Sequence, residues 1–409
     1  MLKLLKSEGI GLSLIVLLNL FLRLFRLDSP NFAYLDEKNF FLPAIRARLQ
    51  EVPDFTNEQP QLGKYIIAQS IRLFGDNPWG WRIPSAIFGT LIVVATYFLA
   101  KKIFGGKIIP ILSSLFITFE FSLFILSRMV MMEVFFAAFA LFGLLFVWLY
   151  VKTPKSQNII FSSVFFGFAA SVKWTVTLPL ALSFFFIVFF TKTSLTKKAF
   201  HLALMLLGIT LIYITLYLPF ITQVGINNWI KVHKKAWYYH TTFLPQNYET
   251  YGPYYVPRFR ESEIYFKNPL LWLTDPQIIY FDGSIPENKS FSVILLFSNP
   301  VIFFGGVVAL IYAFFKKIKD LRVLFTCGIF LSAYIPLFFT PPPVTPHYLL
   351  FGIPALCLIL SFATVDIIKN LRWLIFILLI MSIIVFLFYY PLLTALPVRD
   401  GYFHFFTRF

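Results

Sequence analysis

Long apolar runs separated by short polar connections dominate the sequence. A transmembrane helix needs about 20 apolar residues in a row, and eleven runs reach or approach that length. They lie at residues 9–27, 85–100, 108–127, 129–150, 158–172, 175–191, 200–222, 291–315, 323–340, 347–368 and 373–391. Two polar stretches, 28–84 and 223–290, are much longer than the other connections. The pattern predicts an all-α polytopic membrane protein with about eleven transmembrane helices and two long loops.

The composition supports a membrane protein and argues against a nucleic-acid partner. Hydrophobic residues make up 58% of the 409 positions and charged residues only 13%. A soluble protein could not bury so large a share of apolar side chains. The net charge of +16 would suit nucleic acid if the basic residues clustered on one solvated face, but here they punctuate apolar runs. The expected surroundings are therefore the lipid bilayer.

Charge in the short loops predicts the orientation. With a cytoplasmic amino terminus, the inner loops hold fourteen Lys and Arg residues, whereas the short outer connections hold only Arg128 and Lys173. Cytoplasmic loops carry such an excess. We therefore expect both long loops and the carboxyl terminus on the extracytoplasmic side of the cell membrane. Arg23 and Arg26 stand where a signal peptide would have its small-residue cleavage site, so the first run is expected to be retained.

Several kinds of site are missing from the sequence. It contains no Gly-rich phosphate loop and no nucleotide-binding strand–helix unit. The two cysteines, Cys327 and Cys357, lie inside apolar runs and indicate neither a disulfide framework nor a metal site. The expected organisation is one integral membrane domain over residues 1–409, with its chemistry on the outer face.

Ionisable residues from separate connections fall at that outer surface. They are Asp36, Glu37, Lys64, Arg82, Arg128, Glu133, Lys173 and His347. Ionisable groups near the hydrocarbon are costly unless they are paired or hydrated. Their coincidence on one side predicts a shared polar cavity.

Each residue also has a purely structural interpretation. Asp36 is a preferred N-cap type and could begin a short surface helix. Arg128 and Lys173 could be anchors whose charged ends reach water. Glu133 could form a structural ion pair with Arg128, and His347 could be an interfacial histidine held by hydrogen bonds. The stretch 223–290, rich in Trp and Tyr, could stack on sugars or anchor helices at the headgroups.

Several segments occur in an order typical of one enzyme family. They are the pair Asp36–Glu37, "EQPQLGKYIIAQSIRLFGDNPWGWRIPSAIFGTL", "FEFSLFILSRMVMMEVFF", "SVKWT", "YYHTT" and "NPLLWL". Together they resemble the protein O-mannosyltransferases, GT-C glycosyltransferases that take mannose from dolichyl phosphate mannose. The resemblance covers residues 30–180 and is weaker from there to 360. It implies a GT-C fold with two long extracytoplasmic loops.

The chain departs from the family pattern at several points. Gln59 and Gln61 stand where His and Pro are usual, and Glu133 stands where Asp is usual. The second long loop has no insertion comparable to the lectin-like domain of eukaryotic members. The Trp-Trp-Asp-Tyr-Gly segment of oligosaccharyltransferases is absent from the sequence. A prokaryotic or archaeal type of enzyme is therefore expected, and transfer of a whole glycan is disfavoured.

The resemblance implies inverting transfer of a mannose-type sugar from a polyprenyl phosphate to Ser or Thr hydroxyls of a protein. Such a reaction needs a base, and the lipid phosphate leaves with its own charge. No cofactor is firmly implied, although a divalent cation is compatible. The residues assigned are Asp36 and Glu37 as the catalytic pair, with Asp36 as base; Arg128, Lys173, Arg82 and Lys64 at the donor phosphate; and Glu133, His240 and His347 as acceptor or supporting residues. For Arg82 and Lys64 the alternative role is to hold the loop.

Three other functions are compatible with parts of the pattern. A related GT-C enzyme could move another sugar, such as an aminopentose, from a polyprenyl phosphate to a glycolipid. A secondary transporter would fit the number of apolar runs, but transporters place binding groups near the bilayer midplane. A non-catalytic scaffold would show ion pairs without binding a donor. The mannosyltransferase is the preferred interpretation.

Overall fold

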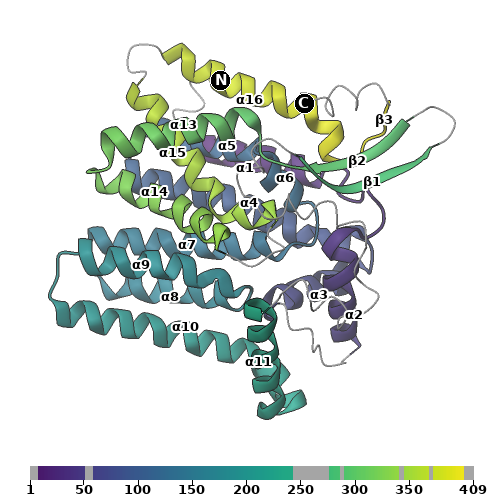
Figure 1. Cartoon of the computed structure of the whole chain (residues 1–409), viewed down its shortest axis with the longest axis horizontal. Helices are drawn as coiled ribbons and strands as arrows, with labels where there is room; N and C mark the ends of the chain where they lie inside the picture. Colours follow the sequence, from purple (N-terminus) through teal and green to yellow (C-terminus); the bar gives the residue numbers. More distant parts are fainter. Residues whose placement is uncertain are drawn as a thin grey trace.

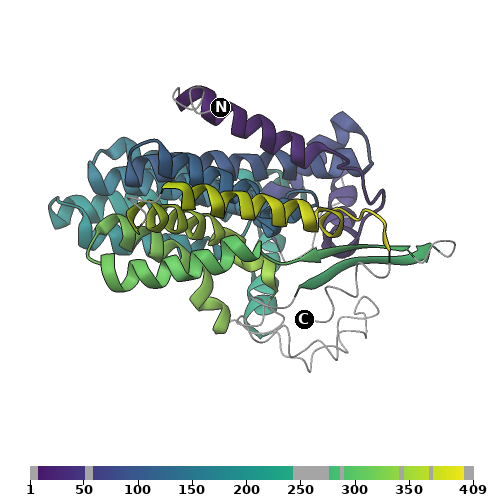
Figure 2. The same ribbon diagram turned by 90° about the horizontal axis from the view of Figure 1, so that it is seen from above.

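The computed structural model describes residues 8–50, 59–242, 276–285, 290–339, 345–367 and 372–399. Its long helices run side by side along one common direction, as Figures 1 and 2 show from two sides. The helices of the bundle are α1 (Glu8–Leu24), α4 (Pro78–Phe104), α5 (Ile108–Thr118), α6 (Phe121–Leu126), α7 (Met132–Lys152), α8 (Ser156–Ala170), α9 (Thr177–Phe190), α10 (Leu195–Val224), α13 (Pro300–Lys317), α14 (Leu321–Tyr334), α15 (Ile353–Ile367) and α16 (Arg372–Leu393).

Each of the eleven predicted apolar runs contains a helix of this bundle. Within the described residues, six helical segments are long and apolar enough to cross a membrane, and five shorter apolar helices accompany them. The polytopic membrane class is thereby confirmed, while the number of membrane-crossing helices stays a prediction. The six are Pro78–Phe104, Met132–Lys152, Leu195–Val224, Pro300–Lys317, Leu321–Phe338 and Ile375–Leu393.

One predicted helical run begins as a strand. The run 291–315 opens in β2 (Ser290–Leu296), and its helix starts only at Pro300. There the Asn299 side chain accepts a hydrogen bond from the Val301 N–H at 3.1 Å, which caps α13. Strand β2 pairs antiparallel with β1 (Gln277–Ile285) and with β3 (Val398–Arg399), in the order β1-β2-β3. A short apolar run cannot be assigned to helix or strand by periodicity alone, so this small sheet is an addition to the predicted helices.

The two long polar stretches form their own elements. The first contains the π-helix η2 (Glu37–Phe41), α2 (Leu42–Leu49) and α3 (Leu62–Phe74). The second contains α11 (Ile226–Thr242) and strand β1. These elements lie at one end of the bundle together with the rest of the sheet, as Figure 1 shows. The end that the sequence assigned to the functional chemistry is therefore a single structural region.

Helix α7 lies at the centre of the bundle. It packs against α4, α8 and α9, and nearly all of its side chains are buried. Helices α10 and α16, by contrast, expose large apolar side chains such as Leu211 and Ile384. Apolar faces on the outer helices are what contact with lipid requires. The first turn of the central helix carries Glu133, so the core positions one of the predicted site residues.

A glycine of α4 allows that helix to approach the turn before α7. A Cβ atom added to Gly89 would overlap the Ser127 Cβ and lie 2.8 Å from the Arg23 Nε. Replacement by Ala should therefore lower the free energy of unfolding by about 1–3 kcal/mol through overpacking. Thermal unfolding of the purified protein in detergent measures the loss of stability in Gly89→Ala. Gly9→Ala is the matched control, because a Cβ at Gly9 meets nothing within 4 Å; equal melting temperatures for the two variants would contradict the prediction.

Candidate functional site

A fully buried ion pair joins the first long loop to α4. The Arg82 Nε and Nη2 atoms lie 3.0 and 2.9 Å from the two carboxylate oxygens of Glu37, and both side chains are 0% exposed. Glu37 Oε1 also accepts a hydrogen bond from the Val130 N–H at 2.8 Å. One carboxylate therefore fixes three chain segments relative to one another.

Arg82 has no remaining N–H for a ligand. Its other donors reach the carbonyl oxygens of Leu27 at 3.1 Å, Pro30 at 2.7 Å and Phe32 at 3.0 Å. A guanidinium has five N–H groups. The two bonds to Glu37 and the three bonds to carbonyl oxygens together use all five. Of the two roles expected for Arg82, these contacts favour holding the loop, and its role at the donor phosphate stays a prediction. The Tyr34 ring lies 5.3 Å from the guanidinium carbon.

Arg128 binds the end of α1. Its Nη1 and Nη2 atoms donate to the carbonyl oxygens of Leu22 at 3.3 Å, Arg23 at 2.8 Å, Phe25 at 2.7 Å and Arg26 at 2.8 Å. The last carbonyls of a helix lack partners within the helix and carry partial negative charge. Arg128 thus caps α1. Among the described residues, no acceptor meets its Nε atom.

The second charged cluster forms where α7, the turn after α8 and η8 (Pro346–Phe351) meet. The Lys173 ammonium forms a salt bridge with Glu133 Oε1, and His347 Nε2 lies 3.4 Å from the same oxygen. The Tyr348 ring lies 4.3 Å from the Lys173 Nζ. Glu133, Lys173 and His347 are each less than a tenth exposed. Three of the eight residues expected at this surface, Glu133, Lys173 and His347, thus lie in contact; a single cavity shared by all eight stays a prediction.

The same contacts decide two structural alternatives. Glu133 pairs with Lys173, so the expected ion pair between Glu133 and Arg128 is wrong. Lys173 and Arg128 are both buried, so neither is an anchor with its charge in water. Burial lowers the pKa of His347 to about 4, against the opposing attraction of Glu133 and with help from the Lys173 charge. His347 is therefore a neutral imidazole at neutral pH, and Thr345 Oγ1 lies 2.7 Å from its Nδ1.

Asp36 precedes the anchored Glu37 directly and is half-buried. It occupies the N-cap position of η2, yet its side chain makes no capping hydrogen bond and its backbone is helical (φ −65°, ψ −25°). The interpretation of Asp36 as a simple helix cap is therefore wrong. Its position follows from the next residue, because Glu37 cannot move without breaking the pair with Arg82.

The start of α3 packs between the two segments that carry Glu133 and Lys173. The Leu62 N–H donates to the Ser171 carbonyl at 2.9 Å, and a Cβ at Gly63 would overlap the Met132 sulfur. Lys64 follows in the first turn and is 2% exposed. The "LGK" segment thus lies beside both charged residues. Gln61, the position where the family resemblance has Pro, is buried, and within the described part of the chain neither its amide nitrogen nor its amide oxygen has a hydrogen-bond partner.

The chain segment 127–133 connects the two clusters. Val130 binds Glu37, Arg128 caps α1, and Glu133 pairs with Lys173. The remaining predicted residue, His240, lies near the end of α11, with its side chain outside the described residues. No group of three His, Cys, Asp or Glu side chains that could hold a metal ion occurs within the described part of the chain.

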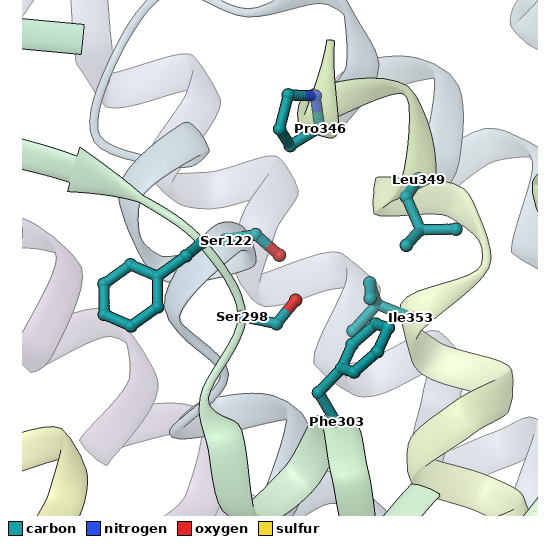
Figure 3. Close-up of a pocket in the computed structure, with 7 residues that line it drawn as sticks. Ser122, Ser298, Phe303, Pro346, Leu349 and Ile353 are labelled. Carbon is teal, nitrogen blue, oxygen red and sulfur yellow. The ribbon is translucent and has the colours of Figure 1, made fainter. Parts of the chain in front are cut away.

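A small cavity lies next to the Glu133 cluster. Its lining residues are Ser122, Phe297, Ser298, Phe303, Pro346, Leu349 and Ile353. The Ser122 and Ser298 hydroxyls point into the same space, as Figure 3 shows. The Ser122 hydroxyl donates a hydrogen bond to the carboxylate of the buried Glu120 at 2.6 Å. None of the lining residues is ionisable, so proton transfer must be sought at the charged clusters.

Sequence reasoning assigned no role to three residues of the site. Tyr348 packs on Lys173, Tyr34 packs on Arg82, and Glu120 caps the short helix α6 that leads to Arg128. The sequence could have pointed to Tyr348, which adjoins His347, and to Glu120, which lies in the segment "FEFSLFILSRMVMMEVFF". It could not have pointed to Tyr34, because the packing of a ring on a guanidinium depends on the folded geometry.

Comparison with known sequences finds similarity over part of the chain. Residues 58–217 match the family model described as dolichyl-phosphate-mannose-protein mannosyltransferase. The polyprenol-phosphate-mannose–protein mannosyltransferase of Mycolicibacterium smegmatis is 29% identical over 115 residues, which cover 28% of this chain and 22% of the relative. The Corynebacterium glutamicum protein of the same description is 32% identical over 80 residues, covering 20% of this chain and 15% of the relative. The alignments thus span less than a quarter of these relatives.

Comparison with solved structures extends over nearly the whole chain. The Saccharomyces cerevisiae protein O-mannosyltransferase Pmt1–Pmt2 complex bound to the sugar donor has a TM-score of 0.75 at 12% identity, covering 98% of this chain and 92% of that chain. ArnT from Cupriavidus metallidurans bound to undecaprenyl phosphate has a TM-score of 0.61 at 14% identity, with coverages of 91% and 62%. The oligosaccharyltransferase of Archaeoglobus fulgidus has a TM-score of 0.57 at 12% identity, covering 95% of this chain and 55% of that chain. These likenesses show the fold.

The pair between Glu37 and Arg82 should dominate the stability of this end of the bundle. Glu37→Gln leaves a buried guanidinium without its counter-charge, so we expect a loss of about 3–5 kcal/mol in the free energy of unfolding. The matched control is Asp76→Asn, because the Arg46–Asp76 pair has the same 2.9 Å separation but is nearly half exposed; such pairs contribute about 0–1 kcal/mol. Thermal unfolding in detergent compares the two variants. Equal losses of stability would contradict a dominant role for the Glu37–Arg82 pair.

Proposed function

Because residues 58–217 carry the sequence of the protein mannosyltransferase family and the helices have the GT-C fold, we propose that this chain is an inverting glycosyltransferase. It moves a mannose-type sugar from a polyprenyl phosphate to Ser or Thr hydroxyls of proteins. In this proposal residues 1–409 form one membrane catalytic domain. The amino terminus is cytoplasmic, and the loops 28–84 and 223–290 are extracytoplasmic.

The observation that carries the proposal is the buried Lys173 beside Glu133 at the same end of the bundle as Asp36. A buried ammonium held by one carboxylate is prepared for a second anion, because it has three N–H groups. Glu133 uses one of them, and the Tyr348 ring covers another side. A lipid phosphate is the anion that a membrane protein meets at this level, and charge-assisted hydrogen bonds would hold it.

Two other cations would assist at the phosphate. Arg128 keeps its position through the α1 carbonyls and has an Nε atom that no described residue uses. Lys64 lies on the first turn of α3, which packs against the segments of Glu133 and Lys173. Positive charge fixed in advance around a leaving phosphate stabilises the charge that develops as the glycosidic bond breaks. No protonating acid is then needed.

Asp36 is the proposed base. Its carboxylate would accept the proton of the attacking hydroxyl while that oxygen bonds to the anomeric carbon from the face opposite the phosphate, and the bond to phosphate breaks. Glu37 supports it by fixing the backbone of the preceding residue through Arg82. Glu133 and the neutral His347 orient Lys173, and His240 stays a proposed acceptor-side residue.

The names of the relatives support this choice over the alternatives. The bacterial relatives are described as using polyprenol phosphate mannose and acting on protein. A sugar other than mannose, or a glycolipid acceptor, remains the first alternative outcome of an assay. A transporter is less well supported, because the charged pairs lie near the starts of α4 and α7 and in the connections beside them instead of at mid-helix. A divalent cation has no assigned ligands in this scheme.

Asp36→Asn should abolish transfer while leaving the fold intact. Loss of a positioned base lowers the rate by about 100- to 10,000-fold. The fold should survive, because Asn keeps the size and shape of Asp and the Asp36 side chain does not cap η2. The measurement is transfer of labelled mannose from a synthetic polyprenyl phosphate to a Ser/Thr peptide by the full chain in nanodiscs, with the melting temperature recorded in parallel. Turnover like that of the unmodified protein would exclude Asp36 as the base.

Lys173→Ala should weaken use of the donor more than use of the acceptor. A hydrogen bond to a charged group contributes about 1.5–3 kcal/mol, so the donor kcat/KM should fall at least tenfold while the acceptor KM changes little. The single variant also leaves Glu133 buried without its partner. The double variant Lys173→Ala/Glu133→Gln removes that penalty, so it should regain stability without regaining donor use. If it regains both, Lys173 has only a structural role.

A further inference from the structure

Helix α11 lies across the end of the bundle instead of along it. It follows α10 after Gly225, whose φ of +82° allows the sharp turn, and it runs across the direction of α10, as Figure 1 shows. A helix that crosses the axis of a transmembrane bundle lies along the membrane plane. The position of α11 relative to the lipid therefore depends on where α10 leaves the hydrocarbon.

The exposed face of α10 locates that boundary. Large apolar side chains are exposed on α10 as far as Leu218. The exposed residues that follow in this helix are Pro219 and the polar Thr222 and Gln223. The apolar stretch that begins after Lys198 spans 20 residues to Leu218, which is about the 30 Å of a hydrocarbon core. Helix α11 starts at Ile226, only a few residues further. It therefore begins at the level of the lipid headgroups.

The side chains of α11 divide into three faces. Val232 and Ala236 are buried against the bundle. Ile226, Ile230 and Trp237 form a stripe that is 59%, 40% and 66% exposed; at 100° per residue these three lie within about 40° of one another on the helix. An exposed apolar stripe with an aromatic residue is typical of helices that lie in the membrane interface.

The third face of α11 is basic. Lys231, Lys234 and Lys235 are exposed, and the helix from Ile226 to Thr242 contains no acidic residue. These lysines occupy the sector next to the apolar stripe. A basic sector beside an apolar stripe is complementary to a bilayer surface that contains anionic phospholipids.

Hydrogen bonds connect α11 to the residue after Lys173. The Trp174 Nε1–H donates to the Tyr213 hydroxyl at 3.0 Å, and that hydroxyl lies 2.8 Å from His233 Nε2 on α11. His233 Nδ1 lies 2.8 Å from the Trp229 carbonyl oxygen. A carbonyl oxygen can only accept, so Nδ1 of His233 carries a hydrogen, and in the neutral imidazole Nε2 accepts from the Tyr213 hydroxyl. The position of α11 is thus transmitted to the segment that carries Lys173.

We propose that α11 is an interfacial helix that binds anionic phospholipids of the leaflet at this end of the bundle. Its apolar stripe enters the headgroup region, and Lys231, Lys234 and Lys235 contact the lipid phosphates. The attachment positions Lys173 through the chain of Trp174, Tyr213 and His233. Only this last consequence rests on the proposed function, because lipid binding by α11 does not require catalysis.

Spin labels on the full chain in nanodiscs test the lipid contact. A label at Ile230→Cys should be more accessible to oxygen than to a water-soluble nickel complex in discs with phosphatidylglycerol, and a label at Lys235→Cys should show the reverse. The unmodified chain, whose Cys327 and Cys357 are buried, gives the background. Equal nickel accessibility at the two positions would overturn the proposal, whatever the enzyme assay shows.

The donor KM tests the link to Lys173. In discs with phosphatidylglycerol, the triple Lys→Gln variant at 231, 234 and 235 should show a several-fold higher donor KM with little change in acceptor KM. In phosphatidylcholine discs it should equal the unmodified protein. Tyr213→Phe should remove the dependence of KM on anionic lipid and leave the Ile230→Cys label unchanged. An equal effect of the triple variant in both lipids would overturn the link, and absence of transfer by every form would count against the proposed function instead.

Discussion

The buried pair between Glu37 and Arg82 is the constraint on which this end of the molecule depends. Arg82 gathers three carbonyls of the first loop, and Glu37 adds the Val130 N–H of the turn before α7. Two charges taken out of water are tolerated only when every donor and acceptor is satisfied, and here the five guanidinium N–H groups all are. The pair therefore fixes where Asp36 stands relative to the turn that leads to Glu133.

The sequence predicted that ionisable residues gather at one end of the bundle, because such groups near the hydrocarbon must be paired or hydrated, but it did not predict which charges pair. Glu133 pairs with Lys173 and Glu37 with Arg82, whereas the sequence offered Arg128 as the partner of Glu133. The other partners of Arg82 and Arg128 could not be predicted because they are carbonyl oxygens, which every residue carries. Strand β2 was taken for helix because an apolar run of seven residues has no distinguishing period.

The fold explains why such separate segments lie together. The bundle brings the end of α1 next to the starts of α4 and α7, and the first long loop adds Glu37 to them. Lys173 is then linked in two directions: to Glu133 at the centre of the bundle and, through Trp174, Tyr213 and His233, to α11, the proposed interfacial helix. A site that takes a lipid-borne substrate would in this way sense the bilayer that delivers it.

The most direct measurement is a cryo-EM structure of the full chain in nanodiscs with a non-hydrolysable polyprenyl phosphate sugar. The account predicts phosphate density within hydrogen-bonding distance of the Lys173 Nζ, with the anomeric carbon facing the Asp36 carboxylate and the Glu37–Arg82 pair unchanged. Donor density that lies away from Lys173, or a sugar whose anomeric carbon Asp36 cannot reach, would contradict it.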